Sequence, residues 1–181
     1  NSIFVQKWPV PPEEPAPEGQ NVPPRRENKV VGTHVFDEYP TYEEWISQFD
    51  FTQRPNMGAL EPVHFGHLPV WSEGNVYLNG ARPWKNEVNC VVVEDGQEIK
   101  VELMEKDGEY YLETNVFEYI KDFHTRMINT EVLGKAFEPE QYFENPDGTP
   151  IRFDTDYFGN HRGIRVIPGP FASTADKIKV L

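Results

Sequence analysis

Residues 153–163, FDTDYFGNHRG, combine oxygen-bearing side chains with glycines in a pattern that could bind a cation. Asp154, Asp156 and Asn160 are spaced like the first ligands of a calcium loop. Such a loop also needs a bidentate carboxylate downstream, and the next acidic residue is Asp176. The stretch therefore favours a turn in which Asp and Asn side chains cap backbone N–H groups, with calcium as the weaker alternative.

Histidine and cysteine do not form a convincing metal or nucleophile site. His64 and His67 are three residues apart, but Pro62 and Gly66 argue against the helix that this spacing would need, and no third ligand is near. Cys90 is the single cysteine and lies in the apolar run VNCVVV, where a buried, inert thiol is expected. We expect no metal site and no cofactor.

Acidic residues are plentiful enough for glycoside chemistry. That reaction needs two carboxyl groups about 5–10 Å apart across a sugar-sized cleft. Candidates include Glu87, Glu113, Asp154 and Asp156, yet separation in sequence does not reveal separation in space. No catalytic pair is assigned, and whether the chain is an enzyme is left open.

Aromatic side chains offer a second kind of sugar chemistry, because a sugar ring stacks its C–H face on an exposed aromatic ring. We interpret four residues as carbohydrate-binding candidates, Trp71, Tyr77, Trp84 and Tyr111, with core packing as the competing interpretation of each. Trp84 lies in the polar stretch RPWKNE and is the one most expected at the surface. Tyr110 and Tyr111 must face opposite sides of an alternating strand, so one of them should be exposed.

The elements that would position these residues begin after a proline-rich segment. Residues 1–28 contain WPVPPEEPAPEGQNVPP, which predicts an extended arm or linker. Residues 29–74 are predicted to be irregular except for a short helix over 42–49. Thr41 and Glu44 have the spacing of a capping box at its start.

Residues 75–181 are predicted to form a β-rich domain. Strands are expected at about 88–94, 98–105 and 109–115, joined at Asp95-Gly96 and Asp107-Gly108, because Asp-Gly is a strong hairpin signal. The middle strand alternates in polarity, which predicts one buried and one solvated face. Residues 116–128 have the spacing of a short helix. The fold class is therefore all-β, mainly antiparallel hairpins, resembling a β-helix end or a β-sandwich, with one or two short helices.

Three stretches carry a family resemblance: GNVYLNGARPWKNE (74–87), LGKAFEPEQYFENPDGTPIRFDTDYFGNHRG (133–163) and PGPF (168–171). In this order they resemble the C-terminal end of secreted right-handed parallel β-helix proteins of the pectate-lyase-like group. The resemblance implies a bacterial, secreted or cell-surface protein that degrades polysaccharides as a glycosidase or lyase. Such enzymes carry their catalytic residues in upstream coils, and residues 1–73 show no coil pattern, so no catalytic residue is transferred.

Charge limits the choice of partner. The formal net charge is −13, which argues against nucleic acid and against an anionic membrane surface. A glycan or polysaccharide is the expected ligand, and a partner chain or a missing upstream segment is a further expected contact. Three functions stay open: a terminal region of a carbohydrate-active protein, a stand-alone carbohydrate-binding module, or a non-catalytic subunit or assembly module.

Overall fold

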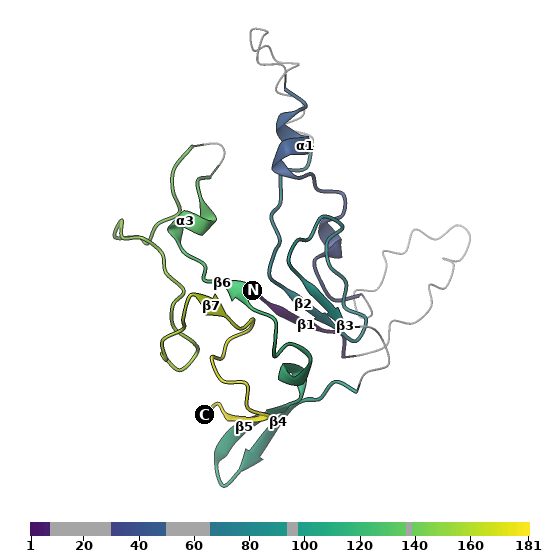
Figure 1. Cartoon of the computed structure of the whole chain (residues 1–181), viewed down its shortest axis with the longest axis vertical. Coiled ribbons are helices and arrows are strands. Elements are labelled where there is room, and N and C mark those ends of the chain that lie inside the picture. The colour runs from purple at the N-terminus through teal and green to yellow at the C-terminus, as the bar shows by residue number, and fades with distance from the viewer. Residues whose placement is uncertain (8–29, 50–65, 94–97, 137–138) are drawn as a thin grey trace, which may run out of the picture. The chain divides into compact units, whose positions relative to one another are not determined.

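The computed structural model describes residues 1–7, 30–49, 66–93, 98–136 and 139–181. Contacts divide the chain into an N-terminal unit, Phe4–Gln97, and a C-terminal unit, Asn1–Ile3 with Glu98–Leu181. Most of the regular elements among the described residues are strands in small sheets (Figure 1). The predicted all-β class with short helices is therefore confirmed. The predicted domain boundaries, including the arm over 1–28, stay predictions, and most of that arm lies outside the described residues.

The N-terminal unit is built on the sheet β1-β2-β3, whose strands are Ile3–Val5, Val76–Leu78 and Val91–Val93. β2 and β3 are parallel, with Val76 opposite Val91. All three residues of β2 are fully buried. The predicted pairing of the 88–94 strand with the 98–105 strand is thus wrong. Its VNCVVV run lacks alternation, as is typical of strands in parallel sheets, and residues 94–97 lie outside the described part.

The helix predicted over 42–49 is α1, Tyr42–Ile46, and it is preceded by the 3₁₀ helix η2, His34–Phe36. The capping box is confirmed: the Glu44 N–H donates to Thr41 Oγ1 at 3.2 Å, and the Thr41 N–H donates to Glu44 Oε2 at 2.8 Å. The chain then continues to Phe49 through i to i+3 hydrogen bonds. Those bonds tighten the last turn and make the α-helix shorter than predicted.

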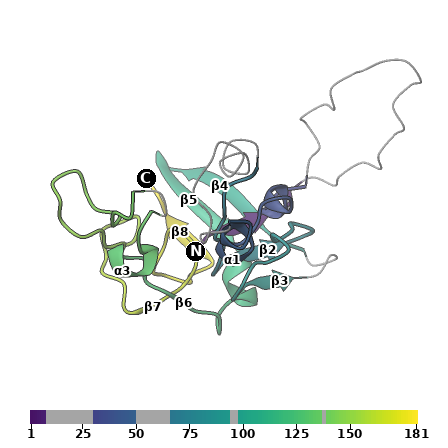
Figure 2. The same ribbon diagram turned by 90° about the horizontal axis from the view of Figure 1, so that it is seen from above.

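The C-terminal unit contains the sheet β4-β5-β8, formed by Val101–Lys106, Glu109–Thr114 and Lys177–Lys179 (Figure 2). β4 and β5 form the predicted antiparallel hairpin. Asp107 and Gly108 have φ values of 56° and 80°, the positive values that a two-residue type I′ turn requires. The local Asp-Gly signal was sufficient to identify this turn.

The predicted buried face of the 98–105 strand is wrong. All six residues of β4 are exposed, and Leu103 is 65% exposed. β4 lies at the edge of its sheet, and no described element covers this apolar face. The alternating sequence therefore predicted correctly that β4 has one apolar and one polar face. It did not reveal that the apolar face is exposed to water.

The remaining elements of the C-terminal unit are short. They are η4 (Val116–Tyr119), β6 (Thr125–Arg126), α3 (Thr130–Leu133) and β7 (Arg165–Val166), and β6 pairs with β7. The helical spacing predicted over 116–128 corresponds to η4, which buries Val116 and Phe117. It is a 3₁₀ rather than an α-helix because its bonds run from Glu118 to Asn115 and from Ile120 to Phe117. No helix among the described residues is long and apolar enough to cross a membrane.

Candidate functional site

In the N-terminal unit, the exposed ring of Trp71 stacks on the half-buried ring of Tyr42. Their ring centroids are 6.1 Å apart with an interplanar angle of 18°, and Trp71 is 69% exposed. The Val70 N–H donates to the Pro40 carbonyl at 3.1 Å, which joins the two segments that carry the rings. Together with the capping box before Tyr42, this bond positions Trp71 as a flat apolar surface open to solvent.

Further rings pack beside this pair and hold it in place. Trp45 is buried, and its ring centroid lies 6.2 Å from Tyr42 and 4.7 Å from Phe49. A separate stack, of Tyr39 on His67 with centroids 4.1 Å apart, joins the same two segments of the chain. The exposed ring of Trp71 therefore belongs to a local aromatic cluster and does not project alone from a loop.

A hydrogen-bonded polar cluster begins at the next residue along the chain. The Asn75 amide donates to Ser72 Oγ at 3.0 Å and to Glu87 Oε1 at 2.6 Å. Thr33 Oγ1 donates to Glu87 Oε2 at 3.0 Å and lies 2.7 Å from the Tyr77 hydroxyl. The Glu87 carboxylate is thus held by neutral donors from two other segments of the chain.

Burial is the main cause of the unusual ionisation of Tyr77. It raises the pKa of Tyr77 to about 12, and hydrogen bonding to Thr33 opposes this shift while the nearby Glu87 carboxylate adds to it. Burial also raises the pKa of the Cys90 thiol, with a second contribution from Glu87. At neutral pH both groups are therefore protonated and neutral, and Glu87 lies among neutral partners.

Two of the predicted sugar-binding aromatics are buried. The expected exposure of Trp84 is wrong, since its side chain is only 3% exposed, and its backbone N–H donates to Thr33 Oγ1 at 2.8 Å. Tyr77 is fully buried, and its ring stacks on Phe4 at 5.2 Å with an angle of 7°. Neither residue can offer a ring face to a sugar, so only Trp71 of the three candidates in this unit is exposed.

Tyr111, the fourth candidate, lies in the C-terminal unit on β5. Its hydroxyl donates to Glu109 Oε2 at 2.6 Å, and Lys177 Nζ lies 4.8 Å from its ring centroid. The hydrogen bond to Glu109 is the main cause of its raised pKa. One ring face of Tyr111 is therefore occupied by a cation, and the residue is part of a charged surface.

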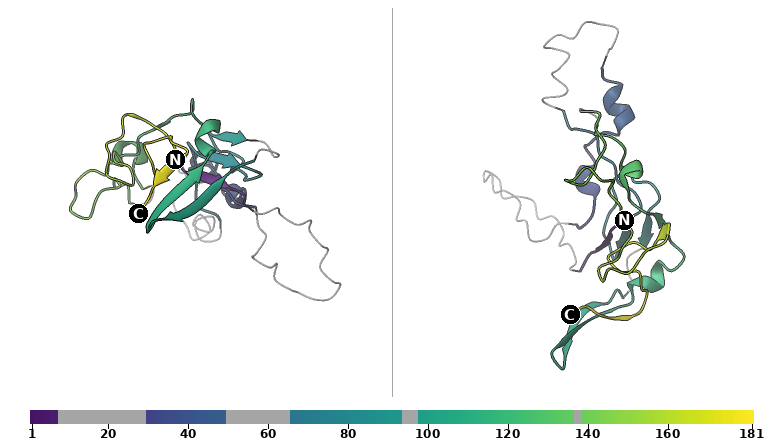
Figure 3. Two further views of the ribbon diagram at one scale, coloured as in Figure 1. Left: turned by 90° about the horizontal axis from the view of Figure 1, so that it is seen from below. Right: turned by 90° about the vertical axis from the view of Figure 1, so that its left-hand side faces the viewer.

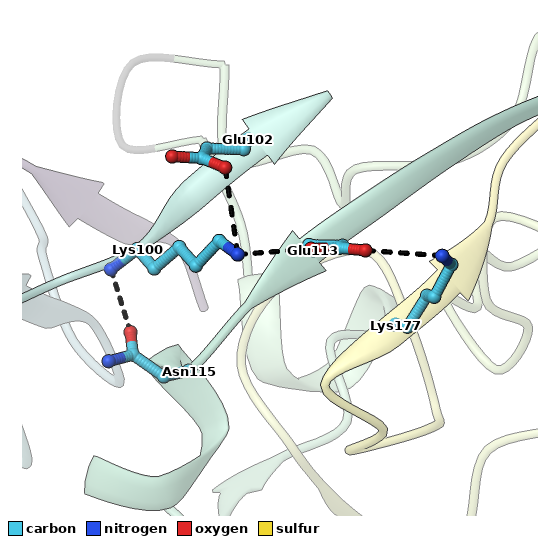
Figure 4. A network of polar contacts seen from close by, with 5 residues as sticks. All are labelled: Lys100, Glu102, Glu113, Asn115 and Lys177. Atoms are coloured by element: carbon cyan, nitrogen blue, oxygen red, sulfur yellow. Dashed lines mark hydrogen bonds and ion pairs between the residues drawn. The ribbon is translucent and has the colours of Figure 1, made fainter. Parts of the chain in front are cut away.

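That charged surface alternates basic and acidic side chains across β4, β5 and β8 (Figure 4). Lys100 Nζ lies 3.0 Å from Glu113 and 3.6 Å from Glu102, and Lys177 Nζ lies 3.1 Å from Glu113. Lys179 pairs with Glu109. The lysines of these pairs are exposed, so each pair contributes little to stability.

The structure predicts how Glu113 and Glu109 titrate. Hydrogen bonds from Lys100 and then Lys177 lower the pKa of Glu113, and bonds from Lys179 and then Tyr111 lower that of Glu109. Their stabilisation is fully present above the unfolded glutamate pKa of about 4.3 and is lost as pH falls through the lower folded value. Carboxyl-carbon NMR titration should give midpoints below that of a free glutamate.

Lys177→Met provides the control for this titration. Removing the ammonium group should raise the midpoint of Glu113 and leave that of Glu109 unchanged, because Lys179 still pairs with Glu109. A wild-type Glu113 midpoint equal to that of a free glutamate would contradict the ion pairs.

Asp156 forms the turn that its position in FDTDYFGNHRG predicts. Oδ1 accepts the N–H groups of Phe158 at 2.9 Å and Asn160 at 2.8 Å, and Oδ2 accepts that of Ala172 at 3.1 Å. Burial would raise the pKa of Asp156, but these hydrogen bonds outweigh it and lower the pKa. Among the described residues, no group of three or more His, Cys, Asp or Glu side chains lies close enough together to hold a metal ion. His64, one of the two histidines considered for a metal site, lies outside these residues.

The four candidate carboxylates have separate surroundings. Glu87 lies in the polar cluster, Glu113 lies between two lysines, Asp156 caps a turn, and Asp154 lies 3.4 Å from Arg152 Nε. Sequence reasoning named Glu87 only as one available acid and missed its hydrogen-bond partners Thr33 and Asn75. It also missed Tyr42, which stacks on Trp71, as a site residue. The capping box at Thr41 and the helical spacing of Tyr42 with Trp45 and Phe49 pointed to Tyr42 only as a residue that packs on a core.

Comparison with family models and with curated protein sequences finds no match. Among solved structures, the chain is similar to XylC in a complex with xylose, with 25% sequence identity and a TM-score of 0.72. The similarity covers 86% of this chain but only 24% of XylC, so the chain spans about a quarter of the length of that protein.

Proposed function

We propose that this chain is the β-rich terminal region of an exported carbohydrate-active protein and that it binds a pyranose ring on Trp71. The single observation that carries the proposal is the open ring of Trp71, 69% exposed and stacked on Tyr42. The similarity to a structure of XylC with xylose supports a sugar as the ligand. A secreted or cell-surface location, with neither nucleic acid nor membrane as partner, belongs to the same proposal.

The hydrogen-bonding groups beside Trp71 suit the hydroxyls of a neutral sugar. Ser72 follows Trp71 directly, and Asn75 links Ser72 to the Glu87 carboxylate. Sugar sites combine an aromatic face with a few polar groups that fix orientation. The Glu87 carboxylate has only neutral donors as partners, so it would accept hydrogen bonds from sugar hydroxyls and repel the carboxylate of a uronate. The formal net charge of −13 also disfavours an anionic sugar.

Parallel pairing in the N-terminal unit supports a pectate-lyase-like β-helix as the parent architecture. Val76 pairs with Val91 and Glu73 with Val88 in one continuous register, so the chain returns to a parallel neighbouring position after this circuit. Phe4 and Tyr77 stack nearly flat on adjacent strands. Stacked parallel coils of a solenoid place equivalent residues above one another in this way.

The test measures binding of xylose and xylo-oligosaccharides by calorimetry. Trp71→Ala should weaken binding by about tenfold, because ring stacking contributes up to about 1.5 kcal/mol. Its thermal midpoint should stay unchanged, since surface substitutions rarely alter stability by more than about 0.5 kcal/mol. Phe153→Ala is the matched control: Phe153 is 60% exposed but lies in the C-terminal unit, and its removal should leave binding unchanged.

Equal affinity of Trp71→Ala and the wild type would overturn the proposed site. A reducing-sugar assay on the same samples separates the functions. Sugar release by the wild type would indicate catalysis within this chain, whereas binding without release would support a binding role. Absence of both would leave the non-catalytic assembly module as the function.

A further inference from the structure

We propose that two copies of this chain associate by antiparallel pairing of their β4 strands along the outer edge of the sheet β4-β5-β8. β4 is six residues long, exposed throughout and located at the end of the strand order. Among the residues that the structure describes, no strand pairs with its outer side. Such an edge offers unpaired N–H and C=O groups to another strand.

Hydrogen bonds on the far side of β5 define which peptide groups of β4 point outward. Tyr110 and Thr114 of β5 bond toward β8: the Tyr110 N–H donates to Leu181 O at 3.0 Å and the Thr114 N–H to Asp176 O at 2.8 Å. Peptide groups alternate between the two sides of an antiparallel strand. Glu109, Tyr111 and Glu113 therefore bond toward β4.

The register of the hairpin transfers this alternation to β4. Lys106, Met104 and Glu102 lie opposite Glu109, Tyr111 and Glu113 and use their peptide groups within the hairpin. The peptide groups of Val101, Leu103 and Glu105 consequently point to the outer edge. Only registers that pair odd-numbered residues with odd-numbered residues can form hydrogen bonds there.

Charge selects one register from those that remain. When Met104 of one copy lies opposite Met104 of the other, Glu102 of each copy lies opposite Lys106 of the other copy. The dimer then contains two such pairs of opposite charge. Centring the pairing on Leu103 would place Lys100 opposite Lys106, and centring it on Glu105 would place two glutamates opposite each other. Opposite charges across a strand pair stabilise it and like charges destabilise it.

The chosen register also suits the side-chain positions. Glu102 and Lys106 fall at non-hydrogen-bonded positions, where facing side chains are closest. On the other face, Leu103 lies diagonally next to Leu103 of the second copy, which partly buries a side chain that is 65% exposed in the single chain. The hairpin that presents this edge is visible from two further sides in Figure 3. The formal net charge of −13 opposes association, so a weak dimer is expected.

Sedimentation velocity of the full chain over about a hundredfold concentration range tests the proposal, because a weak dimer shifts with concentration by mass action. The wild type should show reversible monomer–dimer exchange. Glu102→Lys and Lys106→Glu should each weaken dimerisation by about tenfold or more, since each converts two attractive pairs into two repulsive ones. Glu105→Lys changes the net charge as Glu102→Lys does but faces Leu103, so it should dimerise like the wild type.

Charge reversal provides the decisive arm. An equimolar mixture of Glu102→Lys and Lys106→Glu restores both opposite-charge pairs and should dimerise, although neither variant does so well alone. Leu103→Pro removes an outward N–H and should abolish dimerisation without breaking the β4–β5 hairpin. A monomeric wild type over the whole range, dimerisation unaffected by Leu103→Pro, or a mixture that stays monomeric would each overturn the proposal.

Discussion

Replacing Trp84 with alanine is expected to lower the free energy of unfolding of the N-terminal unit by about 3–5 kcal/mol. The side chain is 3% exposed and belongs to the core that surrounds the fully buried strand β2. Truncating Trp84 to alanine removes the apolar contacts of its indole ring and leaves a cavity that the surrounding structure can only partly close. Hydrogen exchange of the β2 amides in Val76–Leu78 measures the effect within this unit alone.

Trp71→Ala is the matched control for Trp84→Ala. Both variants lose the same atoms, but Trp71 is 69% exposed, so its loss should change stability by less than about 0.5 kcal/mol. Trp84→Phe should lower the free energy of unfolding clearly less than Trp84→Ala does. It keeps most of the apolar volume and removes the indole N–H, for which the described residues provide no acceptor. Equal protection in Trp84→Ala and the wild type would show that Trp84 does not lie in the core.

The position of Trp84 illustrates why a polar neighbourhood in sequence can mislead. Its neighbours Arg82 and Lys85 are exposed, as the RPWKNE stretch indicates. The direction of the Trp84 side chain depends instead on a segment some fifty residues earlier. The Arg82 N–H donates to Val31 O at 2.9 Å, and the Trp84 N–H donates to Thr33 Oγ1 at 2.8 Å. No local pattern contains that information.

Features defined by neighbouring residues could be predicted from the sequence. The capping box at Thr41 and Glu44 and the type I′ turn at Asp107 and Gly108 each need only a few consecutive residues, and both form as expected. Their physical basis is local: a side chain that satisfies an orphan N–H group and a turn that requires positive φ. The all-β class followed from several such signals together.

Features that join distant segments could not be predicted. The 88–94 strand pairs in parallel with β2, whereas the Asp-Gly signal after it suggested antiparallel pairing with the 98–105 strand. The Glu87 cluster needs Thr33, Asn75 and Glu87 to meet from three segments. Trp71 was identifiable as an aromatic candidate, but its exposure and its stacking on Tyr42 depend on the Val70–Pro40 hydrogen bond between segments.

Replacing Gly32 with alanine is expected to destabilise the N-terminal unit by about 3 kcal/mol or more, because a close contact and a strained backbone act together. Gly32 has a φ of +136° and forms a parallel bridge with Arg82. A Cβ atom at this position would lie 2.1 Å from the carbonyl oxygen of Arg82. That atom belongs to the backbone, so relief requires the two segments to separate.

Separation would also disturb the polar cluster, since Thr33, the residue after Gly32, is bonded both to Arg82 and to Glu87 of that cluster. The Thr33 N–H donates to Arg82 O at 3.0 Å, and its hydroxyl donates to Glu87. We therefore expect faster hydrogen exchange of the Thr33 and Arg82 amides together with a lower thermal midpoint. Gly163→Ala is the control, because no atom lies within 4 Å of the added Cβ. Wild-type stability and exchange in Gly32→Ala would mean that residues 31–33 do not run against Arg82, and the hydrogen bonds that hold Glu87 would then need another origin.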